Sequence, residues 1–339
     1  MRGPRNYEYV NALVRAHIGK LLRERDYKAV LGCSRPSEIK QVLSNSSYSQ
    51  HLSRIVSDSF AAIEEAISSS ASETAARVIG ASPEPARPIL NEYRLCLESR
   101  SLVNALRLQL SPEDAYASAG VIPLGAIPFA YYEAKLPLSA EESSKLPGLS
   151  GTVAESLHAA RLHKSNIPLL KITFHLCERF LDIKPGGSRV ERASLERLVI
   201  SHIDGANIEA ILTCASQGIC RDFAKNLLSL RGNLPAESLL AALELRDTER
   251  LLFYLRRSRY GPCLETEPDE AIDHFLMRLP YSIMMQESQH VLAGYPFKAS
   301  VVAAGITLKL LEARNLKLAT AGASGKVDKA SALRLMVAP

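Results

Sequence analysis

The sequence predicts an all-α protein, and three features of the chain support that prediction. Ala, Leu, Ser, Glu and Arg dominate the 339 residues, whereas aromatic residues make up only 6% and Trp is absent. Ala, Leu, Glu and Arg are strong helix formers. Apolar residues recur every three or four positions through most of the chain, which is typical of amphipathic helices. Alternation with a period of two is short and rare, and there is no strand–helix–strand rhythm.

Helix signals follow one another along the chain. The stretch from Tyr9 to Leu31 carries an apolar stripe, and Ser34 with Pro36 marks the start of the next helix. Ser commonly caps a helix, and Pro fits its first turn. The same periodicity predicts later helices around 55–67, 90–106, 195–210 and 301–316, and a short one from Ala330.

Composition predicts a soluble or peripheral protein in a reducing compartment. Apolar residues make up 47%, charged residues 23%, and the net charge is +5. This mild basic excess suits an acidic partner or an anionic membrane surface, and is weaker than that of a typical nucleic-acid binder. The six Cys form no CxxC pair, which predicts reduced thiols. The N-terminus lacks a signal-peptide core, and the longest nearly uncharged helical stretch, 299–308, is about half a bilayer span.

Two distant segments follow one template. Residues 43–52 (LSNSSYSQHL) and 255–264 (LRRSRYGPCL) both read Leu-x-x-Ser-x-Tyr-x-x-x-Leu, with Tyr48 and Tyr260 at the same place. A degenerate counterpart lies near 145–151. This similarity predicts an internal repeat.

An Asn recurs at a matching distance from each template. Asn104 lies 56 residues after the first Tyr, Asn315 lies 55 residues after the second, and Asn207 lies between them. An acid occupies the position three residues earlier in two copies, at Asp204 and Glu312, whereas the first copy has Ser there. This spacing places both side chains on one helical face, and a buried Asn can bond a neighbouring backbone. We expect packing residues here; the alternative is that they shape loops that touch a partner.

The repeat predicts three similar helical lobes of roughly a hundred residues around a pseudo-threefold axis, in a funnel-like arrangement. Two of the Asn copies are followed by a Gly-x-apolar-Pro element, at Gly120 and Gly232. A period of this length is typical of tandem domains, because solenoid repeats are only 20–50 residues long. We place the units at 1–113, 114–216 and 217–322, followed by a tail at 323–339.

The motifs that would indicate chemistry are incomplete. The eight His do not cluster at ligand spacing and no HExxH is present, so we expect no metal site. The segment GASGK (322–326) lacks the first Gly and the final Ser or Thr of a phosphate loop. Cys214 and Cys220 lie on expected helices, where Cys is usually inert. The sequence therefore predicts no catalytic residue and no cofactor.

A basic segment with aromatic residues, RLLFYLRRSRY (250–260), is the strongest candidate for nucleic-acid binding. On a helix, however, Leu251, Leu252 and Leu255 would face inward and the Arg residues would form a solvated face. We therefore expect no nucleic-acid partner, and note that such a face could meet an acidic protein.

The opening YEYVNALVRAHIGKLLRERDY (7–27) resembles the start of the C subunit of archaeal and bacterial A/V-type ATP synthases, whose eukaryotic counterpart is subunit d of the vacuolar proton pump. The segment 43–48 resembles the family's Leu-x-x-Thr-x-Tyr element, and LLEARNLKLATAG (310–322) resembles its ending. The matching residues at the two ends are Tyr7, Tyr9, Asn11, Ala12, Val14, Arg15, Leu21, Leu22, Tyr27, Glu312, Asn315, Leu316 and Gly322. The sequence departs from the family pattern at Lys317, where Arg is usual, and at Ser101, where an acid is usual.

This resemblance implies a non-catalytic central-stalk subunit. Such a protein links the rotor-ring proteolipids to the central shaft on the cytoplasmic face of the membrane, and couples ATP synthesis or hydrolysis to ion transport. Contact with the membrane would be peripheral, through the ring. The alternative is an unrelated all-α scaffold that binds protein or RNA through one lobe; a helical hydrolase is disfavoured because no catalytic constellation is present.

Overall fold

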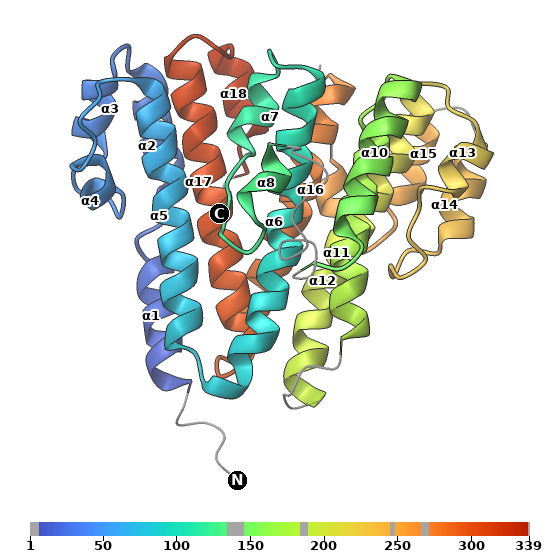
Figure 1. The fold of residues 1–339 in the computed structure, drawn as a ribbon, viewed down its shortest axis with the longest axis horizontal. Helices are drawn as coiled ribbons and strands as arrows, with labels where there is room; N and C mark the ends of the chain where they lie inside the picture. Colours follow the sequence, from blue (N-terminus) through green and yellow to red (C-terminus); the bar gives the residue numbers. More distant parts are fainter. Residues whose placement is uncertain (1–6, 134–145, 184–188, 245–247, 266–270, 338–339) are drawn as a thin grey trace.

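The computed structural model describes residues 7–133, 146–183, 189–244, 248–265 and 271–337. Every regular element within these ranges is a helix, which confirms the predicted all-α class. Figure 1 shows the longer helices standing side by side in one broad array.

The N-terminal helices lie at the left of Figure 1 against the C-terminal helix α17 (Ala299–Ala323). Of these, α1, α2 and α5 pack directly on α17, so segments from opposite ends of the chain are neighbours. The five N-terminal helices are α1 (Glu8–Ile18), α2 (Glu24–Gly32), α3 (Pro36–Val42), α4 (Ser49–Leu52) and α5 (Phe60–Ala81).

The single helix expected over 9–31 is wrong, because α1 ends at Ile18 and α2 begins at Glu24. In the loop between them, the Leu22 N–H donates to a carboxylate oxygen of Glu312 on α17 at 2.6 Å. A long-range hydrogen bond thus takes the place of a helical one. The local apolar pattern could not reveal this, because it continues across the loop.

Two other helix starts differ slightly from expectation. Arg35, rather than Ser34, is the residue before the first turn of α3, with Pro36 at its first position. Helix α5 begins at Phe60, where the Ser59 hydroxyl accepts a hydrogen bond from the Ala62 N–H at 3.2 Å and caps the helix.

The middle and right of Figure 1 contain the remaining helices. Helix α6 (Arg87–Leu110) follows a short 3₁₀ turn (Glu84–Ala86) and packs on both α5 and α11. Helix α12 (Arg189–Ser216) packs along α16 (Ile272–Leu292), and α16 packs on α17. The other elements are α7 (Ala115–Ala119), α8 (Phe129–Tyr132), α10 (Leu149–His163), a 3₁₀ turn (Ile167–Leu169), α11 (Leu170–Asp182), α13 (Arg221–Lys225), α14 (Ala236–Leu243), α15 (Thr248–Leu255), a 3₁₀ turn (Gly261–Leu264) and α18 (Lys329–Leu335).

One helix in the described residues, 192–216 within α12, is long and apolar enough to cross a membrane by length and composition. Of its most apolar window, 83% is buried inside the protein. Its hydrophobicity is therefore accounted for by core packing, as in the central helix of a soluble bundle.

The hydrophobic core is continuous across much of the molecule. One cluster of buried side chains extends from Tyr7 to Val337 and includes residues of α1, α5, α12, α16 and α17. A second cluster fills the space between α6, α8, α10 and α11, with Leu102, Tyr131 and Val153 in it. Since the first core spans the predicted boundaries, the division into units at 1–113, 114–216 and 217–322 stays a prediction.

Candidate functional site

Asp204 on α12 holds the segment that follows that helix. Its Oδ2 accepts a hydrogen bond from the Tyr260 hydroxyl at 2.7 Å, and its Oδ1 accepts one from the Leu234 N–H at 3.1 Å. Burial raises the pKa of this carboxyl, and the same hydrogen bonds oppose the shift. Burial and the nearby Asp204 also raise the pKa of Tyr260. The predicted acid and tyrosine therefore meet, although 56 residues separate them.

Glu312 on α17 makes the same pair of contacts with the N-terminal segment. Its Oε2 accepts from the Tyr48 hydroxyl at 2.8 Å, and its Oε1 from the Leu22 N–H at 2.6 Å. Lys309 donates to Oε2 at 2.5 Å and lies over the Tyr48 ring. Burial lowers the pKa of this Lys, and Glu312 opposes the shift. All three side chains are buried, so the contact depends on full mutual pairing.

In the first copy, a carboxylate one turn earlier and a Ser at the position of the acids make the corresponding contacts. Ser101, at the position of the acids, accepts the backbone N–H of Ile122 at 2.7 Å. The carboxylate is Glu98, about one helical turn earlier, and it accepts the Tyr132 hydroxyl at 2.8 Å. Its Oε2 also accepts the Ala126 N–H at 2.7 Å. Sequence reasoning missed Glu98 and Tyr132, because the matching spacing is shifted by a turn; a search for any acid on this face of α6 could have found Glu98.

The three predicted Asn residues are all buried, but their partners differ. Asn207 exchanges two hydrogen bonds with the backbone of Ser229, at 2.9 and 3.0 Å. Asn315 makes the same exchange with Val337, at 2.8 and 3.1 Å, again 22 residues later in the chain. Asn104 instead donates to the Tyr281 hydroxyl of α16 at 2.9 Å. Two copies thus anchor a following segment, and the first connects two long helices.

The two Gly-x-apolar-Pro elements lie directly against these helices. A Cβ atom at Gly120 would lie 2.1 Å from Nδ2 of Asn104, and a Cβ atom at Gly232 would lie 2.3 Å from Oδ1 of Asp204. Only Gly allows the backbone to approach so closely. A side chain at either Gly would displace Asn104 or Asp204.

These contacts join each long helix to the segment that follows it in a cyclic order. Helix α6 contacts the segment around Ile122, and α12 contacts the segment around Leu234. For α17, which comes last, the partner is the segment around Leu22 at the other end of the chain. The third set of contacts therefore closes the molecule by joining its two ends.

The remaining predicted residues, Tyr9, Asn11 and Arg15, lie on α1 outside these contacts. Tyr9 is 70% exposed, and Arg15 is also exposed. The Asn11 side chain is half-buried, and its Oδ1 is buried without a hydrogen-bond donor in the described residues. These three residues do not share a site with Tyr48 or the buried Asn residues.

Within the described ranges, no group of three or more His, Cys, Asp or Glu side chains could hold a metal ion. A surface hollow of about 640 Å³ lies between α5 and the loop before α8 and is lined by Ser and Glu side chains together with Phe129 and Lys317. Leu251, Leu252 and Leu255 face inward as the sequence predicts, while Phe253 and Tyr254 of the same helix are exposed.

Comparison with known proteins identifies the family. No curated protein matches the sequence. A family model described as the ATP synthase (C/AC39) subunit matches residues 10–334, nearly the whole chain. This match confirms the resemblance found at the two ends of the sequence, and it includes α6, α12 and α17. The chain therefore belongs to the ATP synthase (C/AC39) subunit family, which marks it as a subunit of a V- or A-type ATPase.

Proposed function

We propose that this protein is the non-catalytic central-stalk subunit that links the shaft of an A/V-type ATPase to its membrane rotor ring, on the cytoplasmic face. Family membership supports the coarser part of this statement, namely a structural subunit that associates with other subunits of the complex as a peripheral component. The match over residues 10–334 is the observation that carries the proposal.

The packing is consistent with a mechanical role. A rotor element must carry torque between two partners without deforming, which requires long elements joined by buried, fully paired contacts. Asp204 and Glu312 provide such contacts at α12 and α17. Glu312 joins α17 to the N-terminal segment, so a force applied to one of these two parts would be transmitted to the other.

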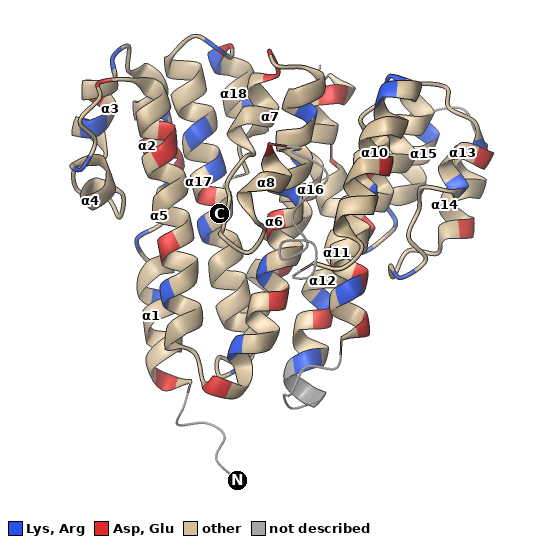
Figure 2. Cartoon of the chain, viewed as in Figure 1, with Lys and Arg blue, Asp and Glu red and all other residues tan. Residues whose placement is uncertain are grey.

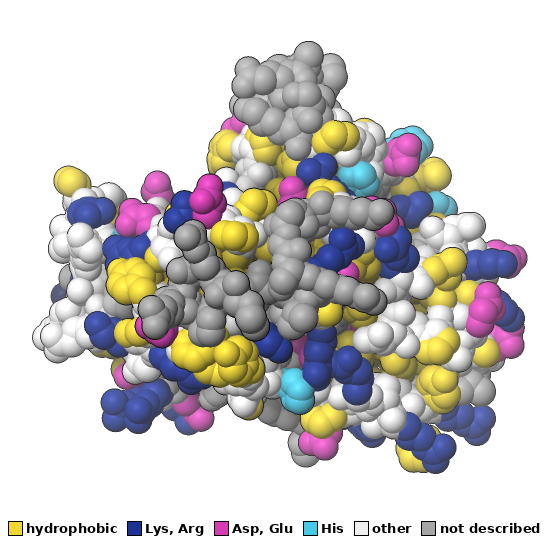
Figure 3. Space-filling view, turned by 90° about the horizontal axis from the view of Figure 1, so that it is seen from below, with side chains coloured by type: hydrophobic (Ala, Val, Ile, Leu, Met, Phe, Trp, Pro, Cys, Tyr) yellow, Lys and Arg dark blue, Asp and Glu magenta, His cyan; other side chains and the backbone are white. Residues whose placement is uncertain are grey.

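The outer surface offers mixed chemistry for protein partners. Figure 2 shows acidic and basic residues distributed over helices in every part of that view. Figure 3 shows apolar side chains beside Lys and Arg side chains on the lower end of the molecule. Protein interfaces combine apolar and charged residues in this way, whereas nucleic-acid binding usually requires a stripe of basic charge.

Affinity purification of the tagged chain from gently solubilised native membranes, followed by mass spectrometry, tests the proposal. We expect the rotor-ring proteolipid and the central-shaft subunits to co-purify. Recovery of soluble proteins or RNA alone would refute the stalk assignment and favour the scaffold, and the exposed Phe253 and Tyr254 beside Arg257 would then be the surface to mutate.

The non-catalytic assignment has its own test. The isolated chain should hydrolyse no ATP. A specific ATPase activity that stays constant through repeated purification would contradict the assignment. Removal of the chain from the complex should instead uncouple ATP turnover from ion transport, measured in the same vesicles.

A further inference from the structure

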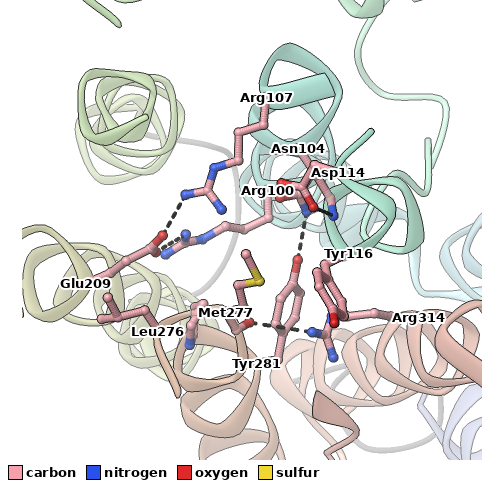
Figure 4. Close-up of a pocket in the computed structure, with 12 residues that line it drawn as sticks. Arg100, Asn104, Arg107, Asp114, Tyr116, Glu209, Leu276, Met277, Tyr281 and Arg314 are labelled. Atoms are coloured by element: carbon pink, nitrogen blue, oxygen red, sulfur yellow. Dashed lines mark hydrogen bonds and ion pairs between the residues drawn. The ribbon is translucent and has the colours of Figure 1, made fainter. Parts of the chain in front are cut away.

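A small cavity that is partly open to solvent lies between α6, α7, α12, α16 and α17. Figure 4 shows Arg100 and Arg107 of α6 directed toward Glu209 of α12, with Tyr281 and Arg314 on the opposite side. The cavity volume of about 20 Å³ is enough for one species of the size of a water molecule. None of these charged residues belongs to the predicted contacts of the long helices.

The charges around this cavity do not balance. Three guanidinium groups line it, from Arg100, Arg107 and Arg314, against two carboxylates, from Glu209 and Asp114. Glu209 pairs with both Arg100 and Arg107, the latter at 2.7 Å. Burial alone would raise the pKa of Glu209, but these two Arg residues outweigh burial and lower it. Three guanidinium groups facing two carboxylates leave a formal excess of one positive charge.

Asp114 is already used for another purpose. Its Oδ1 accepts the Ala117 N–H at 2.9 Å and caps α7. Its charge also helps to raise the pKa of Arg107, after the larger effect of Glu209. It forms no ion pair with Arg314 in the described part of the chain.

Arg314 is the source of the excess charge. It is only 4% exposed, and its guanidinium is held by backbone carbonyl oxygens, with Nη1 2.9 Å from Leu335 O and Nη2 3.5 Å from Met277 O. The Tyr281 ring lies 3.8 Å from its Cζ. No carboxylate of the described residues pairs with it. A buried charge without a counter-charge is costly, and burial accordingly lowers the pKa of Arg314.

Unused hydrogen-bond donors accompany the excess charge. Nε and Nη2 of Arg100, which is 4% exposed, and Nε of Arg107 have no acceptor among the described residues. The Tyr281 oxygen accepts a hydrogen bond from Asn104, which leaves its own hydrogen free to donate. Unpaired donors and positive charge therefore belong to residues that line the same cavity, whose inner space of about 20 Å³ suits a species of the size of one atom or one water molecule.

We propose that this cavity binds one monatomic anion, which is chloride under cellular conditions, as the counter-ion of Arg314 and the Arg100–Glu209–Arg107 cluster. The anion would neutralise the leftover charge and hold α6, α12, α16 and α17 together. A water molecule could accept hydrogen bonds from the donors but could not balance the charge. Experiments that detect a halide therefore distinguish an anion from a water molecule in the cavity.

Diffraction from crystals grown in bromide, with data collected at the bromine edge, provides the direct test on the unaltered full-length chain. We expect an anomalous peak in the cavity within contact distance of Arg100 and Arg314. Density without an anomalous peak, at full bromide exchange, would identify a water and overturn the proposal.

Thermal unfolding supplies the solution test. The melting temperature should rise with chloride or bromide and saturate, at constant ionic strength maintained with gluconate. Replacing Arg314 with Met should abolish the saturable rise, whereas Arg231→Met, which removes an exposed pair with Asp182, should leave it intact.

Glu209→Gln gives a result that a purely structural role would not produce. This substitution raises the excess from one positive charge to two, so halide affinity should increase by at least about tenfold, equivalent to 1.4 kcal/mol. It also covers the case in which Arg314→Met fails to fold. Equal or weaker halide binding in Glu209→Gln would refute the assignment.

Discussion

At the residue scale, the carboxylates of the long helices are the best-defined feature of this protein. Asp204 and Glu312 each accept one tyrosine hydroxyl and one backbone N–H. In the first copy Glu98 accepts a tyrosine hydroxyl and a backbone N–H, and Ser101 accepts a further backbone N–H. The departure at Ser101 therefore preserves the contact with the backbone and moves the carboxylate by one turn.

The tyrosine hydroxyls should contribute measurably to stability. Tyr260→Phe and Tyr48→Phe each remove a hydrogen bond to a buried carboxylate, which typically costs about 1.5–3 kcal/mol. The loss should be larger for Tyr260→Phe, because Lys309 still neutralises Glu312 when Tyr48 is altered. Tyr9→Phe is the matched control, since Tyr9 is 70% exposed. Urea unfolding measures all three, and equal midpoints would refute the role of the contacts.

Lys317 makes stability depend on pH in an alkaline window. Its Nζ donates to Val121 O at 2.7 Å, and burial lowers its pKa to about 8. The folded protein therefore loses this proton at a lower pH than the unfolded chain, whose Lys titrates near a pKa of about 10.4. Between these values the unfolded state binds more protons, so this residue favours folding increasingly as pH rises.

Comparison with Lys317→Met isolates that effect from other titrations. We expect the stability of the natural protein relative to Lys317→Met to increase between pH 7.5 and 9.5, as measured by urea unfolding at each pH. A parallel pH dependence in the two proteins would show that Lys317 stays charged in the folded state throughout this range.

At the element scale, local patterns predicted most helices and missed their tertiary interruptions. The long helices α6, α12 and α17 were predictable because their apolar periodicity is strong, and each extends beyond the predicted stretch at both ends. The break between α1 and α2 was not, because it serves the contact between Leu22 and Glu312, 290 positions apart. Helix propensity depends on neighbours along the chain, whereas the conformation of this loop is determined by Glu312, near the other end of the chain.

Asn207 and Asn315 should each stabilise a different segment. Asn207→Leu removes both hydrogen bonds to Ser229, and Asn315→Leu removes both to Val337. Amide hydrogen exchange should accelerate around 226–234 in the first variant and around 329–337 in the second. Each variant is the control for the other, and the same exchange pattern in both would indicate general destabilisation without local anchoring.

The candidate contacts were partly predictable for a related reason. Tyr48, Asp204, Asn207, Tyr260, Glu312 and Asn315 stand out because their spacing recurs, and the structure places them at the contacts described. The buried Arg100–Glu209–Arg107 cluster has no repeating counterpart in the sequence. Its residues lie on α6 and α12, and the sequence of either helix alone does not show that these charged residues pair with one another across the interface.

At the scale of the whole molecule, cyclic closure is the property that the order of elements cannot reveal. The α17 helix receives its loop and its tyrosine from residues at the start of the chain, whereas α12 receives them from the residues that follow it. The order in which α17 and the N-terminal segment follow one another along the chain should therefore not matter for folding, provided that both are present.

A circular permutant tests this closure. Joining residue 339 to residue 1 through a Gly/Ser linker of about 20 residues, and opening the chain before Gly218 in the loop after α12, should preserve every contact. It would also make α17 precede its partner segment, as α12 does. We expect cooperative thermal unfolding within a few degrees of the natural chain.

Deletion of residues 1–58 should instead abolish cooperative unfolding, because it removes Leu22 and Tyr48 and uncovers the buried face of α17. A deletion variant as stable as the permutant would show that α17 needs no N-terminal partner, and would refute a role of closure in the stability of the fold.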